Sequence, residues 1–539
     1  MEWSPPSAVR WLFDSERGPS DRLIPRWIFL RALGVIYFSA FFSLVFQIRG
    51  LIGPNGILPA SEYLRSVATQ LGSARFWFAP TLLWFSTSSH MLLALCWVGM
   101  VASLLIILNV WPRVTLATCF ACFLSFIAAA GDFSSYQSDG MLLEAGFISL
   151  FLAPLGIRPG WGAAWTSSRA SWFLLLWEWF RIYFESGVVK IASGDPEWRN
   201  FTAMDEYYQN GPLPTWIGWY AQHLPHRFHA GCVYATLALE LGLVWMFLLP
   251  RRFRIVLFFI VTPWQIGIIL TANYAFLNYL VLALGFLLLD DVFCARFVPA
   301  RFKKLLPLNS KTLVAGSPDA PENHAGRGPY TTSPLTALRL SVTAVMLGWI
   351  FYATTTQLVW MFLPTAPLPA SPVTALEPFR IANRYGLFAV MTRERYEIEF
   401  QGSMDGQNWV AYPFRFKPQD VRTPPGIYAP YQPRFDWNLW FASLGSWREY
   451  PIVPSTEERL LANEPDVLSL FAGNPFAQQP PKQVRAVLWQ YWFTTMAEKR
   501  SQGVWWRREF RGLYAPTLGR DSSGKIEVVE WPSASIPQP

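Results

Sequence analysis

Residues 91–111, MLLALCWVGMVASLLIILNVW, contain no charged side chain and are long enough to cross a lipid bilayer. Four further windows that are nearly free of charge lie at residues 27–48, 230–249, 255–272 and 340–363. The chain of 539 residues is 52% hydrophobic and only 15% charged, and its mean hydropathy is +0.23. In soluble chains about a quarter of the residues are charged. The sequence therefore predicts a polytopic α-helical membrane protein.

Weaker apolar segments raise the expected number of membrane spans to eight or nine. They lie at residues 114–131, 141–156, 172–189 and 276–293. Basic residues between spans mark the cytoplasmic side, and the clearest marker is RRFR at residues 251–254. These flanking residues explain the net charge of +8, so the charge does not indicate nucleic-acid binding.

The positive-inside rule divides the chain into five regions. They are a cytoplasmic tail at residues 1–26, a helical transmembrane domain at 27–293, a basic, Pro- and Gly-rich cytoplasmic linker at 294–338, a last transmembrane helix at 339–363 and an extracytoplasmic domain at 364–539. All five cysteines lie in or beside apolar spans, so we expect the extracytoplasmic domain to fold without disulfides.

The region after residue 363 changes to a pattern typical of β-structure. In RYEIEFQGSMDGQNWVAYPFRF, residues 395–416, apolar side chains alternate on both sides of a turn at 404–407. Alternation around an Asp-Gly bend predicts a β-hairpin. Further strands are expected at residues 484–495 and 525–531, and one or two short helices at 455–473. The domain is therefore predicted to be mixed and mostly β.

One apolar span is unusual because it carries four ionisable residues. It continues into WFRIYFESGVVKIASGDPEWRN, residues 179–200. Glu178, Arg181 and Glu185 are spaced so that they share one helical face, and Lys190 follows near the outer end. Charges inside a membrane are costly, so they pair with one another or line a functional cavity.

Two neighbouring spans each carry a single carboxylate, Glu144 and Glu240. We expect their partners to be Arg181, Lys190 or Arg31. Two interpretations stay open: an internal ion-pair network that fixes helix packing, and an active or transport site.

Two other groups of residues are candidate metal ligands. The His223, His226 and His229 series and the pair Cys119 and Cys122 have spacings seen in metal sites. Pro225 interrupts the histidines, and the cysteines lie inside a span where thiolates are disfavoured, so no metal site is expected.

The segment PRFDWNLWFASL is a candidate surface for a partner protein. It combines Arg434, Asp436, Trp437, Trp440 and Phe441, and on a helix the three aromatic side chains share one face. The favoured interpretation is a core helix that packs under the predicted sheet. The alternative is a client-binding surface, because Trp and Arg are enriched in the energetic centres of protein interfaces.

Four long blocks resemble the lipase maturation factor family. The blocks are residues 137–156, 186–200, 383–420 and 429–444, and the resemblance covers most of the chain. It implies a membrane-embedded factor of the secretory route that helps lipases fold and assemble.

A more distant resemblance concerns Lys190. The pattern YFESGVVK…EW is similar to the segment that carries the base lysine of vitamin K-dependent γ-carboxylases and their HTTM relatives. Those enzymes also use a histidine in a later span, and the matching stretch here, VTPWQIGIILTAN, has none. The absence of this histidine argues against carboxylase chemistry.

The leading functional hypothesis is a maturation factor that acts on secreted clients by binding rather than by catalysis. We expect contacts with membrane lipid and a secreted client, no nucleic acid and no cofactor. The expected location is the bacterial inner membrane or the endoplasmic reticulum membrane. The alternatives are an integral membrane enzyme, with Lys190 as base and intramembrane glutamates lining its cavity, and a transporter.

Overall fold

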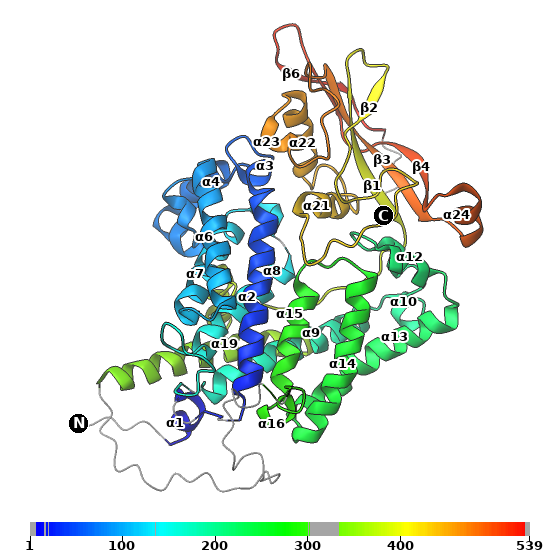
Figure 1. Cartoon of the computed structure of the whole chain (residues 1–539). Helices are drawn as coiled ribbons and strands as arrows, with labels where there is room; N and C mark the ends of the chain where they lie inside the picture. The colour runs from blue at the N-terminus through cyan, green and yellow to red at the C-terminus, as the bar shows by residue number, and fades with distance from the viewer. Residues whose placement is uncertain are drawn as a thin grey trace.

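The computed structural model describes residues 7–15, 18–19, 21–134, 136–165, 167–299, 301 and 334–533. Most of the predicted linker at 294–338 lies outside these residues, as do parts of the predicted tail at 1–26. The described chain has two parts, a helical bundle and a sheet domain placed at one end of it (Figure 1).

The bundle is built from long helices joined by shorter ones. The long helices are α2 (Leu23–Val45), α6 (Ser89–Ile107), α7 (Pro112–Ile127), α8 (Gln137–Leu152), α9 (Arg169–Ala192), α13 (His226–Leu241), α14 (Arg251–Thr271), α15 (Leu277–Gly285) and α19 (Pro334–Phe362). The 3-10 helices η5 (Leu243–Leu248) and η6 (Phe286–Leu288) extend α13 and α15. Shorter helices include α1 (Ser7–Phe13), α3 (Ile48–Ile52), α4 (Ala60–Leu71), α10 (Pro196–Arg199), α12 (Trp216–Gln222), α16 (Asp291–Cys294) and α20 (Ser371–Thr374).

Five helical stretches among the described residues are long and apolar enough to cross a membrane. They are α2, α6, α13 with η5, α14 and α19. Helix α7 and the α15–η6 pair are apolar but shorter, and α9 is long but carries several charges. The structure therefore supports a multi-pass membrane protein, but it does not confirm the predicted eight or nine spans.

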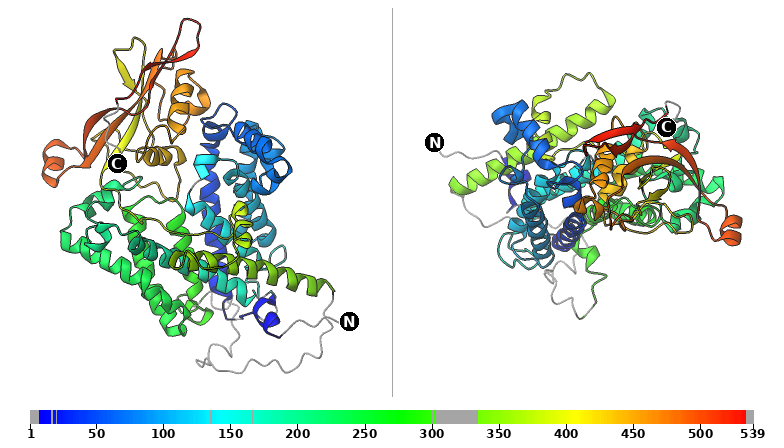
Figure 2. Two further views of the ribbon diagram at one scale, coloured as in Figure 1. Left: turned by 180° about the vertical axis from the view of Figure 1, so that it is seen from behind. Right: turned by 90° about the horizontal axis from the view of Figure 1, so that it is seen from above.

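Helix α19 differs in direction from the other long apolar helices. Side and top views show it running across α2, whereas α2 and α14 run along the bundle (Figures 1 and 2). It packs mainly against α9, α1 and α20. Its length and composition suit the predicted last span at 339–363, but the crossing itself stays a prediction.

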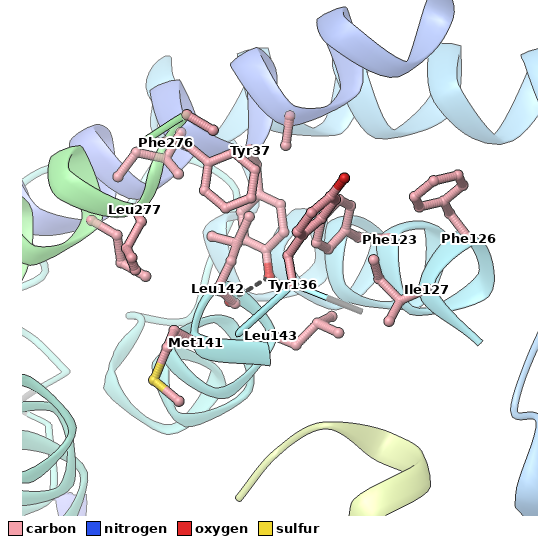
Figure 3. Close-up of a cluster of buried hydrophobic side chains, with 14 of the residues drawn as sticks. Tyr37, Phe123, Phe126, Ile127, Tyr136, Met141, Leu142, Leu143, Phe276 and Leu277 are labelled. Carbon is pink, nitrogen blue, oxygen red and sulfur yellow. Dashed lines mark hydrogen bonds between the residues drawn. The ribbon is translucent and has the colours of Figure 1, made fainter. Parts of the chain in front are cut away.

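Aromatic side chains form the centre of the bundle. Tyr37 of α2 meets Phe123 of α7 edge-on, with ring centroids 6.2 Å apart, and its hydroxyl donates to the Leu142 carbonyl of α8 at 3.2 Å (Figure 3). Such ring pairs contribute about 0.5–1.5 kcal/mol beyond burial. Helices α2 and α6 approach closely because Gly99 faces the ring of Phe41, where a Cβ atom would lie only 2.4 Å from it.

The sheet domain contains one six-stranded antiparallel sheet. Its strands are β1 (Arg395–Ser403), β2 (Trp409–Ala411), β3 (Gln483–Phe493), β4 (Trp506–Leu513), β5 (Thr517–Arg520) and β6 (Ile526–Glu530). The order is β2-β1-β3-β5-β6, and β4 also pairs with β3. The predicted hairpin is confirmed as β1 and β2, and the two other predicted strands are β3 and β6. Strands β4 and β5 were not predicted.

Short helices cover one face of the sheet. They are α21 (Arg434–Ala442), α22 (Ile452–Leu461) and α23 (Pro465–Leu468), and α24 (Met496–Gln502) lies between β3 and β4. Two of them, α22 and α23, confirm the helices predicted at 455–473. The buried β1 side chains Tyr396, Ile398 and Phe400 contribute to the core, where Phe400 contacts Phe435 and Phe471.

The hairpin turn is held by the Asp405 carboxylate. It accepts the backbone N–H groups of Gln407 at 2.9 Å and Asn408 at 2.8 Å. These hydrogen bonds favour the charged form and hold the pKa of Asp405 well below its usual value. Gly406 takes the positive φ of 74° that this turn requires.

Candidate functional site

Arg181, Glu185 and Lys190 of α9 belong to two separate groups, of which the first is the inner cluster of Glu144, Arg181, Glu185 and Asn383. Arg181 forms an ion pair with Glu144 of α8 and donates to the Asn383 carbonyl at 2.6 Å. Glu144 in turn accepts the Asn383 backbone N–H at 2.8 Å. Glu185 lies 3.9 Å from Arg181 and accepts the Tyr385 backbone N–H at 2.6 Å. The inner cluster is buried and internally paired, as in a structural network.

Glu178 shares the helical face of Arg181 but is not part of the inner cluster. Its side chain is fully buried, and its carboxylate forms no ion pair with any residue that the structure describes. The predicted ladder therefore contains Arg181 and Glu185 with Glu144, and Glu178 stands outside it. The buried Arg31 guanidinium does not pair with Glu144 or Glu240.

The second group is the lysine pair, Lys190 with Glu240 of α13. The Lys190 Nζ atom lies 2.8 Å from a Glu240 carboxylate oxygen and 2.6 Å from the Ser186 hydroxyl. It also lies 5.1 Å from the centre of the Trp198 ring, within range of a cation–π contact. Lys190 is only 3% exposed, so its ammonium does not extend out of the bundle.

The inner cluster and the loop after α9 both contact one irregular segment, the strap, residues 381–392 between α19 and β1. The strap supplies Asn383 and Tyr385 to the inner cluster. Farther along, the Phe388 carbonyl accepts the Trp198 indole N–H at 2.9 Å, and the Met391 N–H donates to Asp195 at 2.6 Å. Polar groups of α9 and of the loop after it are therefore satisfied by backbone far along the chain. Sequence reasoning missed the strap, because backbone donors leave no residue pattern.

A cavity of about 310 Å³ opens beside the lysine pair. Residues of α9, α13, α14, α15 and the strap line it, including Tyr183, Gln265 and Tyr385. The lysine pair lines this cavity, but the inner cluster does not. The four charged positions singled out on α9 thus do not converge on one site.

The histidine series does not form a metal site in the described part of the chain. His223 contacts the Thr494 carbonyl at 2.9 Å, His226 contacts Asp205 at 2.9 Å, and His229 is buried against a different carbonyl. No three His, Cys, Asp or Glu side chains of the described residues come together as ligands. The histidines instead form separate hydrogen bonds, each with a different partner.

The segment with the candidate client-binding residues forms helix α21, and its burial favours the interpretation as a core helix. Arg434, Asp436, Trp437 and Trp440 are buried, and Phe441 is half-buried. A buried helix cannot offer these side chains to a second protein. The aromatic spacing instead belongs to a core helix between the sheet and the bundle.

The charged residues of α21 join the two parts of the molecule. Arg434 makes two hydrogen bonds to Asp139 of α8, at 2.7 and 2.8 Å, and a third to the Phe133 carbonyl at 2.7 Å. Asp436 accepts the Lys417 backbone N–H at 3.2 Å. Burial raises the pKa of Asp436 to about 6, although the Lys417 charge opposes the shift. The sheet domain is therefore anchored to the bundle by buried charges.

A partly exposed aromatic and basic surface lies on the other face of the sheet. This aromatic face consists of Trp409, Arg485, Trp489, Arg508 and Phe510. Arg485 stacks over Trp409 at 4.0 Å, Arg508 stacks over Trp489 at 4.1 Å, and Phe510 meets Trp489 edge-on at 5.3 Å. Phe510 is 49% exposed. Sequence reasoning missed this surface because it needs the β3–β4 pairing, and β4 was not predicted.

Two family models match the chain. The model described as "Lipase maturation factor transmembrane domain" matches residues 24–296, and "Lipase maturation factor C-terminal domain" matches residues 381–516. The first covers the bundle up to α16, and the second covers the strap, the aromatic face and most of the sheet. The matched regions thus include both polar groups of α9.

Similar proteins include "Lipase maturation factor 2" of Gallus gallus, 32% identical over 92% of this chain and 81% of the relative. "Lipase maturation factor 1" of Bos taurus is 31% identical over 94% of this chain and 91% of the relative. "Lipase maturation factor 2" of Homo sapiens is 30% identical over 92% of this chain and 82% of the relative. No solved structure matches the chain.

Proposed function

The chain belongs to the lipase maturation factor family, and from this premise we propose that it is a membrane-bound maturation factor. Its role is to assist the folding or assembly of a secreted client, a lipase by family resemblance. It acts by binding rather than by catalysis. The observation that carries the proposal is the similarity over more than nine-tenths of the chain, which includes the membrane part and the sheet domain together.

The aromatic face supports a binding role. It presents Trp and Arg side chains in a stacked, partly exposed array, and these residue types supply much of the energy of protein interfaces. The Arg434–Asp139 joint fixes the sheet domain on the bundle, so the face is held in a constant position relative to the membrane. A preorganised surface loses less entropy when it binds.

The test is the maturation of a lipase co-expressed with the full chain. Trp489→Ala with Phe510→Ala removes the centre of the aromatic face, and we expect active lipase per lipase polypeptide to fall by about tenfold or more. The matched control is Trp531→Ala, which removes an exposed tryptophan that contacts Trp447 instead. Equal maturation by both variants would contradict binding at this face.

A membrane enzyme is the second candidate, and the cavity beside Lys190 favours it. Against it, an ion pair with Glu240 uses the protonated ammonium, whereas a general base needs a free lone pair. Lys190→Arg separates the two functions, because arginine keeps the charge but cannot act as a base. Binding predicts that this variant still matures the client; catalysis predicts a folded but inactive protein.

The proposal also includes the orientation of the chain in the membrane. Arginine-rich ends of the apolar helices, such as Arg251–Arg254, support a cytoplasmic N-terminal side and an extracytoplasmic sheet domain. The membrane is the bacterial inner membrane or that of the endoplasmic reticulum, and the partners are lipid and a secreted protein. Compartment-specific reporters fused after residue 533 test the side on which the sheet domain lies.

A further inference from the structure

The cavity beside the lysine pair has a long apolar wall. Aromatic and aliphatic side chains of several elements form this wall, among them Trp264, Ile268, Leu277 and Phe388. A volume of about 310 Å³ lies at the lower end of the range for sites that hold small molecules. An occupant therefore has an apolar body that packs against these rings.

The polar end of the cavity carries no free charge. The Lys190 ammonium is already bound by Glu240 and Ser186, so the pair is neutral as a whole. Next to it, Tyr183 donates to Gln265 at 2.8 Å, and Gln265 donates to Asn278 at 2.7 Å. Amide and hydroxyl groups of this kind recognise uncharged oxygen groups.

The exposed lining residues of the cavity lie on α13 and α14, which places its opening between these helices. These helices share the turn at η5 and then diverge, α13 toward α9 and α14 toward α15 (Figure 1). Among the lining residues, Phe228 of α13 is exposed, and so are Pro263 and Gly267 in the middle of α14. Both helices are apolar enough to lie in a membrane, so the opening faces the acyl chains of the lipid.

We propose that this cavity binds one uncharged, long-chain lipid whose head group carries hydroxyl and ester oxygens, as in a monoacylglycerol. The head hydrogen-bonds to Gln265 and Asn278 beside the lysine pair. The chain leaves through the opening between α13 and α14. An anionic head group is disfavoured, because Glu240 already occupies the Lys190 ammonium.

The test measures binding of a photoactivatable monoacylglycerol to the full chain purified in detergent. Gly267→Phe places a ring in the opening, and space exists for it, since a Cβ at Gly267 meets no atom within 4 Å. The matched control is Gly231→Phe on α13, where a Cβ also meets nothing within 4 Å but the position does not line the cavity. We expect cross-linking to fall about tenfold in Gly267→Phe and to stay unchanged in the control.

A second variant and a second probe test the head group. Asn278→Leu should lower cross-linking of the monoacylglycerol probe severalfold, because it removes the last amide in the hydrogen-bonded series Tyr183, Gln265 and Asn278. A fatty-acid probe with the same chain but a carboxylate head should bind about tenfold more weakly than the monoacylglycerol. Equal labelling of both glycine variants, or stronger labelling by the carboxylate probe, would overturn the proposal. These readouts are independent of lipase maturation, so they can fail without affecting the proposed function.

Discussion

Arg181 of the inner cluster and Lys190 of the lysine pair lie on the same helix, α9, yet their surroundings differ. Arg181 is enclosed by two carboxylates and by strap backbone, away from the cavity. Lys190 has one carboxylate partner and lines the cavity wall. Two charges on one helix can thus differ in role: Arg181 supports packing, and Lys190, less than three turns later, borders a cavity.

Removal of Arg181 should show the largest effect. Arg181→Met leaves Glu144 and Glu185 buried without a cation, and breaking a buried pair in this way costs about 3–5 kcal/mol. The loss of stability is measured by thermal unfolding in detergent, with size-exclusion chromatography to monitor the folded fraction. The triple variant with Glu144→Gln and Glu185→Gln should recover part of it. An unchanged melting temperature for Arg181→Met would show that the inner cluster does not stabilise the bundle.

Removal of Lys190 should cost less, about 1–2 kcal/mol, because the Glu240 side chain is 11% exposed and water in the cavity can solvate it. The same unfolding assay on Lys190→Met gives the comparison. If Lys190→Met destabilises the protein as much as Arg181→Met, the distinction between the two groups fails.

Glu457 of α22 sharpens the comparison, since it is a fully buried carboxylate with no ion pair among the described residues. Burial raises its pKa well above the usual value, so the folded state holds a proton that the unfolded state releases. Stability from this group is present below about pH 4.5 and is lost as pH rises toward the folded pKa. Glu457→Gln should therefore raise the free energy of unfolding at pH 7 by about 1–3 kcal/mol. The gain should disappear near pH 4; a gain that is constant with pH would contradict this origin.

The smallest effect is expected at Ser186, whose hydroxyl accepts one hydrogen bond from Lys190 at 2.6 Å. Ser186→Ala should cost about 1 kcal/mol, since Glu240 still holds the ammonium. Double-variant analysis with Lys190→Met checks the assignment. Additive losses would show that the two residues do not interact.

Much of the architecture could be predicted from the sequence, because apolar length and strand alternation are local signals. The windows at α2, α6, α13, α14 and α19 and the β1–β2 hairpin carry such signals. The partners of Glu144 and Glu240 were also within the expected set, since few cations exist in the spans.

The remaining features depend on contacts that side-chain patterns do not encode. The strap binds mainly through its backbone, and Asn383 and Arg181 are separated by 202 positions. Helix α21 is a second example of a contact that the sequence pattern does not specify. Its aromatic stripe indicates a packing surface, but the pattern cannot tell a client from the protein's own sheet and bundle.

The position of the strap has a consequence for biosynthesis. A chain grows at about 5–20 residues per second, so Asn383 leaves the ribosome about 10–40 s after Arg181, which it follows by 202 positions. During that interval Glu144, Arg181 and Glu185 lack the backbone partners that the strap supplies. The polar groups of α8 and α9 are therefore satisfied only by a segment made much later, and a chain that stops before residue 381 never gains these partners.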